Sequence, residues 1–226
     1  MRTVDPEQHA RRRAQILAAA AVEFAEHGVA GASTASICRR AGIGSGTLFH
    51  YFATKRELVR ALFAADLPGN QEARDAAVAD PDPTAGLRRL VSHLAADLAD
   101  PLAPGLTAVL VLQVNEDPEL AELVGGDDAA TRATLTTLLS RLAVAGHRLA
   151  FPPERAAGWI QTLIDASYLS VGENGFDAAA QTAELHAIVD WVAGTTTVAP
   201  PGRPPGPVVR THRQRCDGAR QKEITR

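Results

Sequence analysis

Apolar residues recur through most of the chain at intervals of three and four, which is the period of an amphipathic helix. Near the N-terminus, for example, Ile16, Leu17, Ala20 and Phe24 fall on one helical face. Alternating Val, Ile and Thr runs between turn clusters, which are typical of strands, do not recur. The pattern therefore predicts an all-α fold. The predicted helices cover about residues 7–27, 33–41, 45–51, 54–67, 70–79, 84–99, 102–115, 118–124, 128–149, 153–172 and 178–194.

Capping residues mark several of these helix ends. Gly28 suits the position just after the first helix, where a left-handed backbone is common. Ser33 or Thr34 can cap the start of the second helix with a side-chain oxygen. Thr54 precedes the fourth helix and has Glu57 three residues on, which is the spacing of a capping box.

The breaks and the composition divide the chain into three segments. The head is a set of short helices over residues 7–63, and the body is a set of longer helices over residues 64–197. Within the body, Gly125 and Gly126 are expected to separate two helices. From Pro200 the chain is rich in Pro, Gly and Arg without apolar periodicity, so residues 198–226 are expected to form a disordered basic tail.

Charge is distributed unevenly over these segments. Residues 1–63 carry nine basic and five acidic groups, whereas residues 64–197 carry seven basic and nineteen acidic groups. Residues 198–226 carry seven basic and two acidic groups, and the formal net charge of the chain is −3. A basic head on an acidic body is consistent with a head that meets a polyanion, although charges that merely cover solvated faces give the same sums.

The sequence does not support several classes of protein. No apolar run approaches the roughly 18 residues of a membrane span, and the charged N-terminus lacks the apolar stretch of a signal peptide, so a cytoplasmic protein is expected. Cys38 and Cys216 are far apart and form no disulfide framework. The histidines show no ligand spacing and no catalytic motif is present, so neither a metal site, a cofactor nor an enzyme is expected.

Residues 33–51 have the form of a helix-turn-helix, two short helices joined by a tight turn. Gly42 allows the sharp turn because glycine adopts positive φ without strain. The residues expected to pack between the two helices are Ile37, Ala41, Ile43 and Leu48. The residues expected to face outward from the second helix, where they can reach phosphates and base edges in a major groove, are Ser45, Thr47, Phe49, His50 and Tyr51.

This part of the chain resembles the N-terminal domain of TetR-family transcriptional regulators. The matching stretches are Ile16–Gly28, Ser36–Ile43 and, most specifically, the Gly-Thr-Leu-Phe-His-Tyr-Phe run from Gly46 that is followed by Lys55. The resemblance implies a recognition helix from Ser45 to Tyr51. The residues that it places at DNA contacts are Thr34, Gly46, Thr47, Phe49, His50 and Tyr51, with Lys55 at a backbone phosphate.

Two positions depart from the family pattern. Ala35 stands where some members place a polar residue that reads bases, which puts readout from that helix in doubt. Cys38 replaces the usual alanine and is expected to act as a small core residue.

The family uses its helical body to bind a ligand and to dimerise. Helix 102–115 is apolar nearly all round, so it is expected to be buried and to line a ligand pocket. The candidate ligand-binding residues are His93, Asp97, Leu110, Gln113, Val114 and Trp159. The resemblance implies a homodimer built from helices 153–172 and 178–194, whose apolar stripes include Ile164 and Val189.

Together these observations predict a homodimeric DNA-binding regulator, a repressor released from a palindromic operator by a small-molecule ligand. The alternative is a helical DNA-binding regulator whose body responds to a partner protein instead of a metabolite. A helical enzyme with an accessory DNA-binding head is a third reading, without named catalytic residues.

Overall fold

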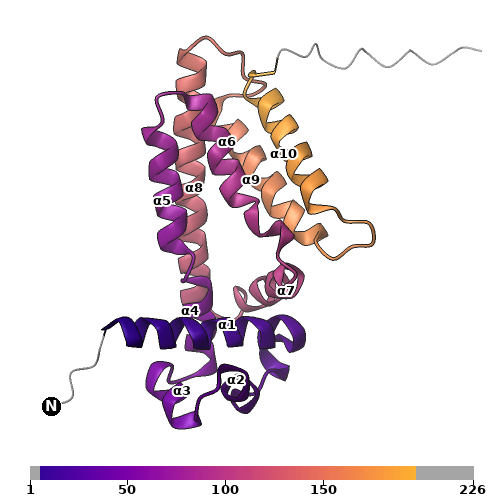
Figure 1. Cartoon of the computed structure of the whole chain (residues 1–226). Helices are drawn as coiled ribbons and strands as arrows, with labels where there is room; N and C mark the ends of the chain where they lie inside the picture. Colours follow the sequence, from indigo (N-terminus) through magenta and orange to yellow (C-terminus); the bar gives the residue numbers. More distant parts are fainter. Residues whose placement is uncertain (1–5, 197–226) are drawn as a thin grey trace, which may run out of the picture. The chain divides into compact units, whose positions relative to one another are not determined.

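A computed structural model describes residues 6–196, and within them the chain forms helices and no strand (Figure 1). The all-α prediction is confirmed. The helices of the head are α1 (Pro6–Gly31), α2 (Thr34–Ala41), α3 (Ser45–Tyr51) and α4 (Lys55–Phe63). The helices of the body are α5 (Leu67–Ala79), α6 (Pro83–Leu94), the short 3₁₀ helix η1 (Ala96–Ala99), α7 (Ala103–Gln113), α8 (Pro118–Val144), α9 (Pro153–Ser170) and α10 (Ala178–Val192).

The helix ends of the head follow the predicted caps. Ser33 caps α2 in a capping box completed by Ser36, and Thr54 accepts a hydrogen bond from the backbone N–H of Glu57 at the start of α4. Helix α1 breaks at Gly28, where φ is 65° and ψ is 172°, and then continues for one further short turn. The signals in this part of the sequence are local, which is why they could be read directly.

Two predicted boundaries of the body helices are wrong. Gly125 and Gly126 do not separate two helices but lie inside α8, which runs unbroken for 27 residues. A glycine inside a helix costs roughly 0.5–1 kcal/mol relative to alanine, and the packing of the rest of α8 outweighs that cost. The predicted helix 84–99 is instead α6 followed by η1, with Ala95 between them.

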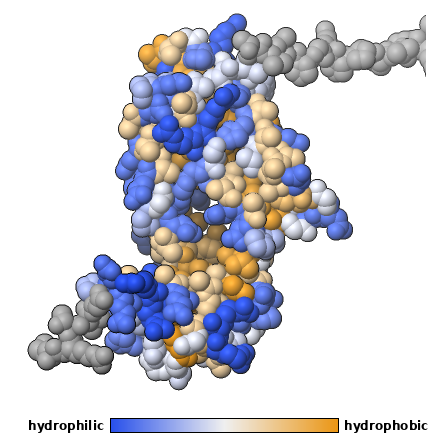
Figure 2. Space-filling model, in the orientation of Figure 1, coloured by the Kyte–Doolittle hydropathy of each residue, from blue (hydrophilic) through white to orange (hydrophobic). Residues whose placement is uncertain are grey.

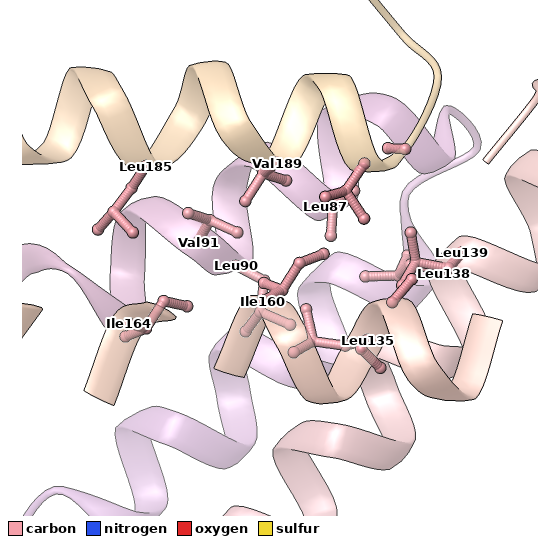
Figure 3. Close-up of a cluster of buried hydrophobic side chains, with 14 of the residues drawn as sticks. Leu87, Leu90, Val91, Leu135, Leu138, Leu139, Ile160, Ile164, Leu185 and Val189 are labelled. Atoms are coloured by element: carbon pink, nitrogen blue, oxygen red, sulfur yellow. The ribbon is translucent and has the colours of Figure 1, made fainter. Parts of the chain in front are cut away.

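The body has its own hydrophobic core, formed where α5, α6, α8, α9 and α10 meet (Figure 3). Leu87 and Leu90 of α6 point toward Leu138 of α8 and Ile160 of α9, and α10 covers them from one side. These side chains are almost completely buried. Burying each such aliphatic side chain is worth about 1.5–3 kcal/mol, so this cluster holds the body together.

The core of the head is completed by residues of the body. The cluster around Ile16, Phe24 and Ile37 also contains Val109 of α7 and Leu120 of α8, which are 4% and 0% exposed. Helix α1 therefore packs on α7, and α4 packs on the start of α8. The division at residues 63 and 64 stays a prediction from sequence, because the hydrophobic packing runs across it.

Helix α7 is not buried all round, contrary to the prediction. Only Ala103 and Val109 are buried, whereas Val111 and Leu112 keep 48% and 65% of their surface exposed. One side of α7 packs against α1, and the residues on its other side remain uncovered in the single chain.

The apolar stripes of α9 and α10 that were predicted to form the dimer interface are buried inside the single chain. Ile164 of α9 and Val189 of α10 are buried in the core of their own chain, at 4% and 0% exposure. They are therefore not available to a second copy. The large apolar side chains that remain exposed on these two helices are Trp159, Leu169, Ile188 and Trp191.

The predicted tail, residues 198–226, lies outside the described residues. Within residues 6–196, no single helix is long and apolar enough to cross a membrane. Helices 83–99 and 103–113 meet that test of length and composition only as a pair, and they are bent by 103° at the break between them.

Candidate nucleic-acid interface

Helices α2 and α3 pack through small and aliphatic side chains, as the sequence predicts. Ile37, Ala41 and Leu48 are at most 2% exposed, and Ile43 is half-buried beside them. Gly42 ends α2 in the left-handed conformation, with φ 62° and ψ 38°. Cys38 is 7% exposed within the same cluster, which agrees with a small core residue. The turn thereby fixes the angle at which α3 is presented.

The outward face of α3 carries the residues predicted to contact DNA. Phe49 is 52% exposed, so its ring is available to a partner. Ser45, Gly46 and His50 are also exposed, and Thr47 and Tyr51 are half-exposed. Thr34, at the start of α2, is half-exposed as well. Hydroxyls and rings of this kind can meet base edges, thymine methyls and phosphates.

Tyr51 is held by a ring that the sequence analysis did not identify. The imidazole of His9 in α1 stacks on Tyr51, with 4.5 Å between ring centroids and 28° between planes. On another side, His50 meets Tyr51 edge-on at 5.5 Å. Because His9 and Tyr51 are 42 positions apart, no local motif could have linked them. The stack limits the directions in which Tyr51 can point.

The basic residues of the head differ in their availability. Arg40 donates to Glu23 at 2.7 Å and to Glu26 at 3.0 Å, and hydrogen bonds from Ser36 and Arg40 lower the pKa of Glu23. Arg40 is therefore committed to α1. Within residues 6–196, Arg39 and Arg56 are exposed and form no ion pair, so they remain free for phosphates.

Lys55 has a partner inside the chain. Its Nζ atom donates to the carbonyl oxygen of Ala32 at 2.9 Å, which holds the start of α4 against the α1–α2 connection. A single carbonyl satisfies one of the three donors of an ammonium group, so the remaining two can still bind a phosphate.

An ion pair joins the head to the body. Arg60 of α4 donates through Nε and Nη2 to both carboxylate oxygens of Asp117, at 2.6 and 2.7 Å, and also pairs with Glu119. Asp117 is 2% exposed and caps the start of α8. The hydrogen bonds from Arg60 lower the pKa of Asp117. A shift of α4 against α8 would have to break this bidentate contact.

A second contact between head and body depends on a glycine. A Cβ atom at Gly105 of α7 would lie 2.2 Å from the carbonyl oxygen of Ala25 in α1. Only a residue without a side chain permits this approach. Together with the Arg60–Asp117 pair, it ties the head to two separate helices of the body.

The body contains a cavity of about 390 Å³ next to the segment that follows α4, and we call it the cavity behind the head. A hollow is visible in the middle of the face drawn in Figure 2. The lining of the cavity comes from the link between α4 and α5, from the start of α5, from the end of α6, from η1 and from α9. The lining residues are Ala65, Asp66, Gly69, Asn70, His93, Leu94, Ala96, Asp97 and Tyr168.

Hydrogen bonds organise the polar side chains of this cavity. The Nε2 atom of His93 lies 2.9 Å from Oδ1 of Asn70, and the Tyr168 hydroxyl donates to the Leu94 carbonyl oxygen at 2.8 Å. Burial raises the pKa of Asp66, and the nearby carboxylate of Asp97 raises it further. The cavity lining thus combines polar and apolar side chains.

The structure brings together only part of the predicted ligand-binding set. His93 and Asp97 line the cavity. Leu110 and Val114 pack instead against the core cluster of the head, and Gln113 donates to Glu116 at 3.2 Å. Trp159 lies on the outer face of α9, 49% exposed.

Three lining residues with polar side chains, Asp66, Asn70 and Tyr168, were not among the predicted ligand-binding residues. They come from α9 and from the start of α5, so only the tertiary fold brings them together. In the part of the chain that the structure describes, no group of three His, Cys, Asp or Glu side chains could hold a metal ion.

Comparison with known proteins agrees with this architecture. Residues 16–62 match the family described as "Bacterial regulatory proteins, tetR family". The HTH-type transcriptional regulator BetI of Burkholderia thailandensis is 33% identical over 173 residues, which cover 70% of this chain and 80% of that protein.

Solved structures share the fold. A TetR transcription regulator from Haloarcula marismortui superposes with a TM-score of 0.70 at 18% identity, over 82% of this chain and 98% of its own. The transcriptional regulator FadR from Bacillus subtilis, solved in complex with stearoyl-CoA, gives a TM-score of 0.64 at 20% identity, over 80% and 98%. The chain belongs to the TetR family of bacterial transcriptional regulators, which are DNA-binding proteins and not enzymes.

Proposed function

We propose that this regulator is a homodimeric repressor that leaves a palindromic operator when a small molecule occupies the cavity behind its head. The observation that carries the proposal is the position of the cavity wall. Asp66 and Gly69 lie in that wall and follow the end of α4 by only a few residues. A molecule in the cavity therefore contacts the segment from which the head is suspended.

The link to DNA runs through α4. Leu58 and Val59 of α4 are buried in the core of the head, while Arg60 holds Asp117 of α8. A displacement of α4 would reorient α3 because the two helices share that core. In a dimer, two recognition helices must lie roughly 34–36 Å apart to enter successive major grooves. The dimer has one conformation whose spacing fits the operator and another whose spacing does not. The ligand releases the operator to the extent that it binds the second conformation more tightly than the first.

Binding to DNA is tested first through Tyr51 and Lys55. On an operator selected from random sequences, Tyr51→Ala is expected to lower affinity about tenfold while affinity for random DNA changes little, since base contacts carry the specificity. Lys55→Ala is expected to weaken both and to reduce the slope of log affinity against log salt by about 0.9, the value for one phosphate. Fluorescence anisotropy at several salt concentrations measures both effects.

The control is Arg89→Ala, which removes a positive charge from the body; Arg89 pairs with Asp80 at an exposed site. Its operator affinity should equal that of the parent protein. Unchanged operator affinity in both Tyr51→Ala and Lys55→Ala would mean that α3 is not the recognition helix.

Dimerisation is proposed to use the exposed apolar faces of α9 and α10. Trp159 and Ile188 are 49% and 38% exposed on these faces. A carboxylate there would be desolvated on association, so Trp159→Glu and Ile188→Glu are expected to yield monomers that no longer bind a palindromic site. Sedimentation velocity gives the oligomeric state, and circular dichroism checks the fold. Thr137→Glu, on the exposed side of α8, is the matched control and should stay dimeric. Dimers in both test variants would exclude this interface.

Release of the protein from its operator is tested by adding fractions of a cell extract to the protein–operator complex. We expect the small-molecule fraction to lower operator affinity. Release by the protein fraction alone would favour control by a partner protein instead.

A further inference from the structure

One face of α1 extends from the core of the head to the end of α3. His9, Arg13 and Ile16 are spaced i, i+4 and i+7 along α1, so they share this face. Ile16 is fully buried in the core of the head. One turn closer to the N-terminus, the guanidinium of Arg13 lies 5.5 Å from the centre of the Phe52 ring. One turn further still, the imidazole of His9 lies 4.5 Å from the centre of the Tyr51 ring.

A hydrogen bond holds the same part of α1 against α2. The Nε2 atom of Gln15 donates to the carbonyl oxygen of Ala41, the last residue of α2, at 2.8 Å. The Nη1 atom of Arg12 donates to Oε1 of Gln15 at 3.1 Å, which orients that amide. The first half of α1 therefore contacts both helices of the helix-turn-helix, and the helix that carries His9 is held in place against them.

The contacts of Tyr51 involve its ring and leave its hydroxyl group unbonded. His9 stacks on the face of the ring with 28° between planes, and His50 meets the ring edge-on with 87° between planes. Within residues 6–196 no group forms a hydrogen bond with the Tyr51 hydroxyl. Aromatic pairs have preferred geometries, so the stack restricts the ring. The hydroxyl can still reach a base edge or a phosphate.

We propose that His9 is a positioning residue for DNA recognition, which holds the Tyr51 ring in its binding orientation before the operator arrives. A side chain has three staggered χ1 orientations, and one that must first find the right orientation binds more weakly by the fraction of time spent in it. By keeping Tyr51 in one orientation, His9 raises operator affinity by about threefold. The inference rests on the proposed function, in which α3 is the recognition helix.

A direct phosphate contact is the competing role for His9, and it has different consequences. Such a contact needs the ring nitrogens, whereas a stack needs only a ring face. A phosphate contact also strengthens binding to any DNA, because phosphates carry no sequence information. Positioning of Tyr51 instead favours the operator over random DNA.

The test measures affinity for the selected operator and for random DNA by fluorescence anisotropy. His9→Ala is expected to lower operator affinity about threefold and to leave affinity for random DNA unchanged. His9→Phe, which keeps a stacking ring without its nitrogens, should restore operator affinity. In the Tyr51→Ala background, His9→Ala should cost nothing further, because the residue that His9 positions is gone.

The matched control is His27→Ala, the same substitution near the other end of α1. The imidazole of His27 is exposed and pairs with Glu26 instead of a ring. This variant should keep the parent's affinity for both DNAs. Circular dichroism should show an unchanged fold for His9→Ala, because position 9 is exposed and alanine favours a helix.

The stack itself is tested in the free protein by nuclear magnetic resonance. The chain contains two tyrosines, so ¹³C-labelled tyrosine gives two sets of ring signals, and Tyr51→Phe assigns them. His9→Ala should move the Tyr51 signals toward those of an unstacked ring, since the ring current of the imidazole is lost. His9→Phe should keep them displaced. The signals of Tyr168, in α9 of the body, serve as the internal reference.

Four results would each overturn the positioning role of His9. They are parent operator affinity in His9→Ala, an equal loss on operator and random DNA in both His9 variants, a further threefold loss from His9→Ala in the Tyr51→Ala background, and Tyr51 signals that His9→Ala does not move. Failure of the proposed function gives another pattern, because Tyr51→Ala then keeps the parent's operator affinity. Failure of the positioning role alone leaves Tyr51→Ala defective and His9→Ala intact.

Discussion

Replacing Asp127 by alanine is expected to lower the free energy of unfolding by about 3–5 kcal/mol, because it leaves a buried arginine without its counter-charge. Arg74 of α5 is 5% exposed and donates to Asp127 of α8 at 2.6 Å and to Thr131 at 3.2 Å. Asp127 also accepts from Asn70 at 2.8 Å, and Asn70 in turn contacts His93 in the cavity wall. One carboxylate thus supports both the packing of α5 on α8 and the shape of the cavity.

Urea denaturation at fixed protein concentration measures this effect, since the stability of the proposed dimer would depend on concentration. The control is the double variant Arg74→Met/Asp127→Ala, in which no charge is left buried. It should recover much of the loss, as a methionine fills similar volume without a charge. A loss of less than about 1 kcal/mol in Asp127→Ala would mean that Arg74 reaches water or another partner.

Gly105→Ala is expected to destabilise the protein by about 3 kcal/mol and to loosen the head from the body. The added methyl group would meet the backbone of Ala25, with its carbonyl oxygen at 2.2 Å and its carbonyl carbon at 2.7 Å. Backbone cannot turn aside as a flexible side chain can, so α1 and α7 must separate, and overpacking of this kind typically costs 1–3 kcal/mol or more. Thermal unfolding gives the stability, and proteolysis between α4 and α5 reports the loosening.

Gly126→Ala is the same substitution in another helix, with the opposite expected sign. No atom lies within 4 Å of the Cβ position at Gly126, which is exposed in α8. Alanine there should raise the free energy of unfolding by about 0.4–1 kcal/mol, because it restricts the unfolded chain without a clash. If both variants lose stability equally, contact with Ala25 is not the reason for the glycine at position 105.

The head could be predicted well because its signals are local. The caps at Ser33 and Thr54, the turn at Gly42 and the buried Ile37 and Leu48 all depend on residues within a few positions of one another. Exposure of the residues on α3 followed from the same helical period. The stack of His9 on Tyr51 lay beyond this range, because it joins the start of α1 to the end of α3.

The body was harder because its features depend on which helices become neighbours. Gly125 and Gly126 resemble a break locally, yet the apolar residues on either side of them hold α8 as one helix. The stripes of α9 and α10 were identified as apolar. An apolar stripe predicts burial, but it does not distinguish burial within the same chain from burial against a second copy. Ile164 and Val189 turned out to face their own core.

The cavity could be predicted least. His93 and Asp97 were among the predicted ligand-binding residues, whereas Asp66, Asn70 and Tyr168 join them only in three dimensions. Helix α7 does not line this cavity, because its apolar residues Leu106, Val109 and Leu110 pack on the core of the head.

The shared core of head and body limits how this regulator can be recombined. Val109 and Leu120 complete the hydrophobic cluster around Phe24, so a fragment ending after α4 would expose the underside of that cluster to water. A chimaera that grafts this head onto another regulator's body would need a matching aliphatic surface on the recipient, together with a glycine opposite Ala25 and an acid opposite Arg60. On the proposed function, operator specificity should therefore be changed more readily by exchanging exposed side chains of α3, such as Phe49 and His50, than by exchanging whole modules.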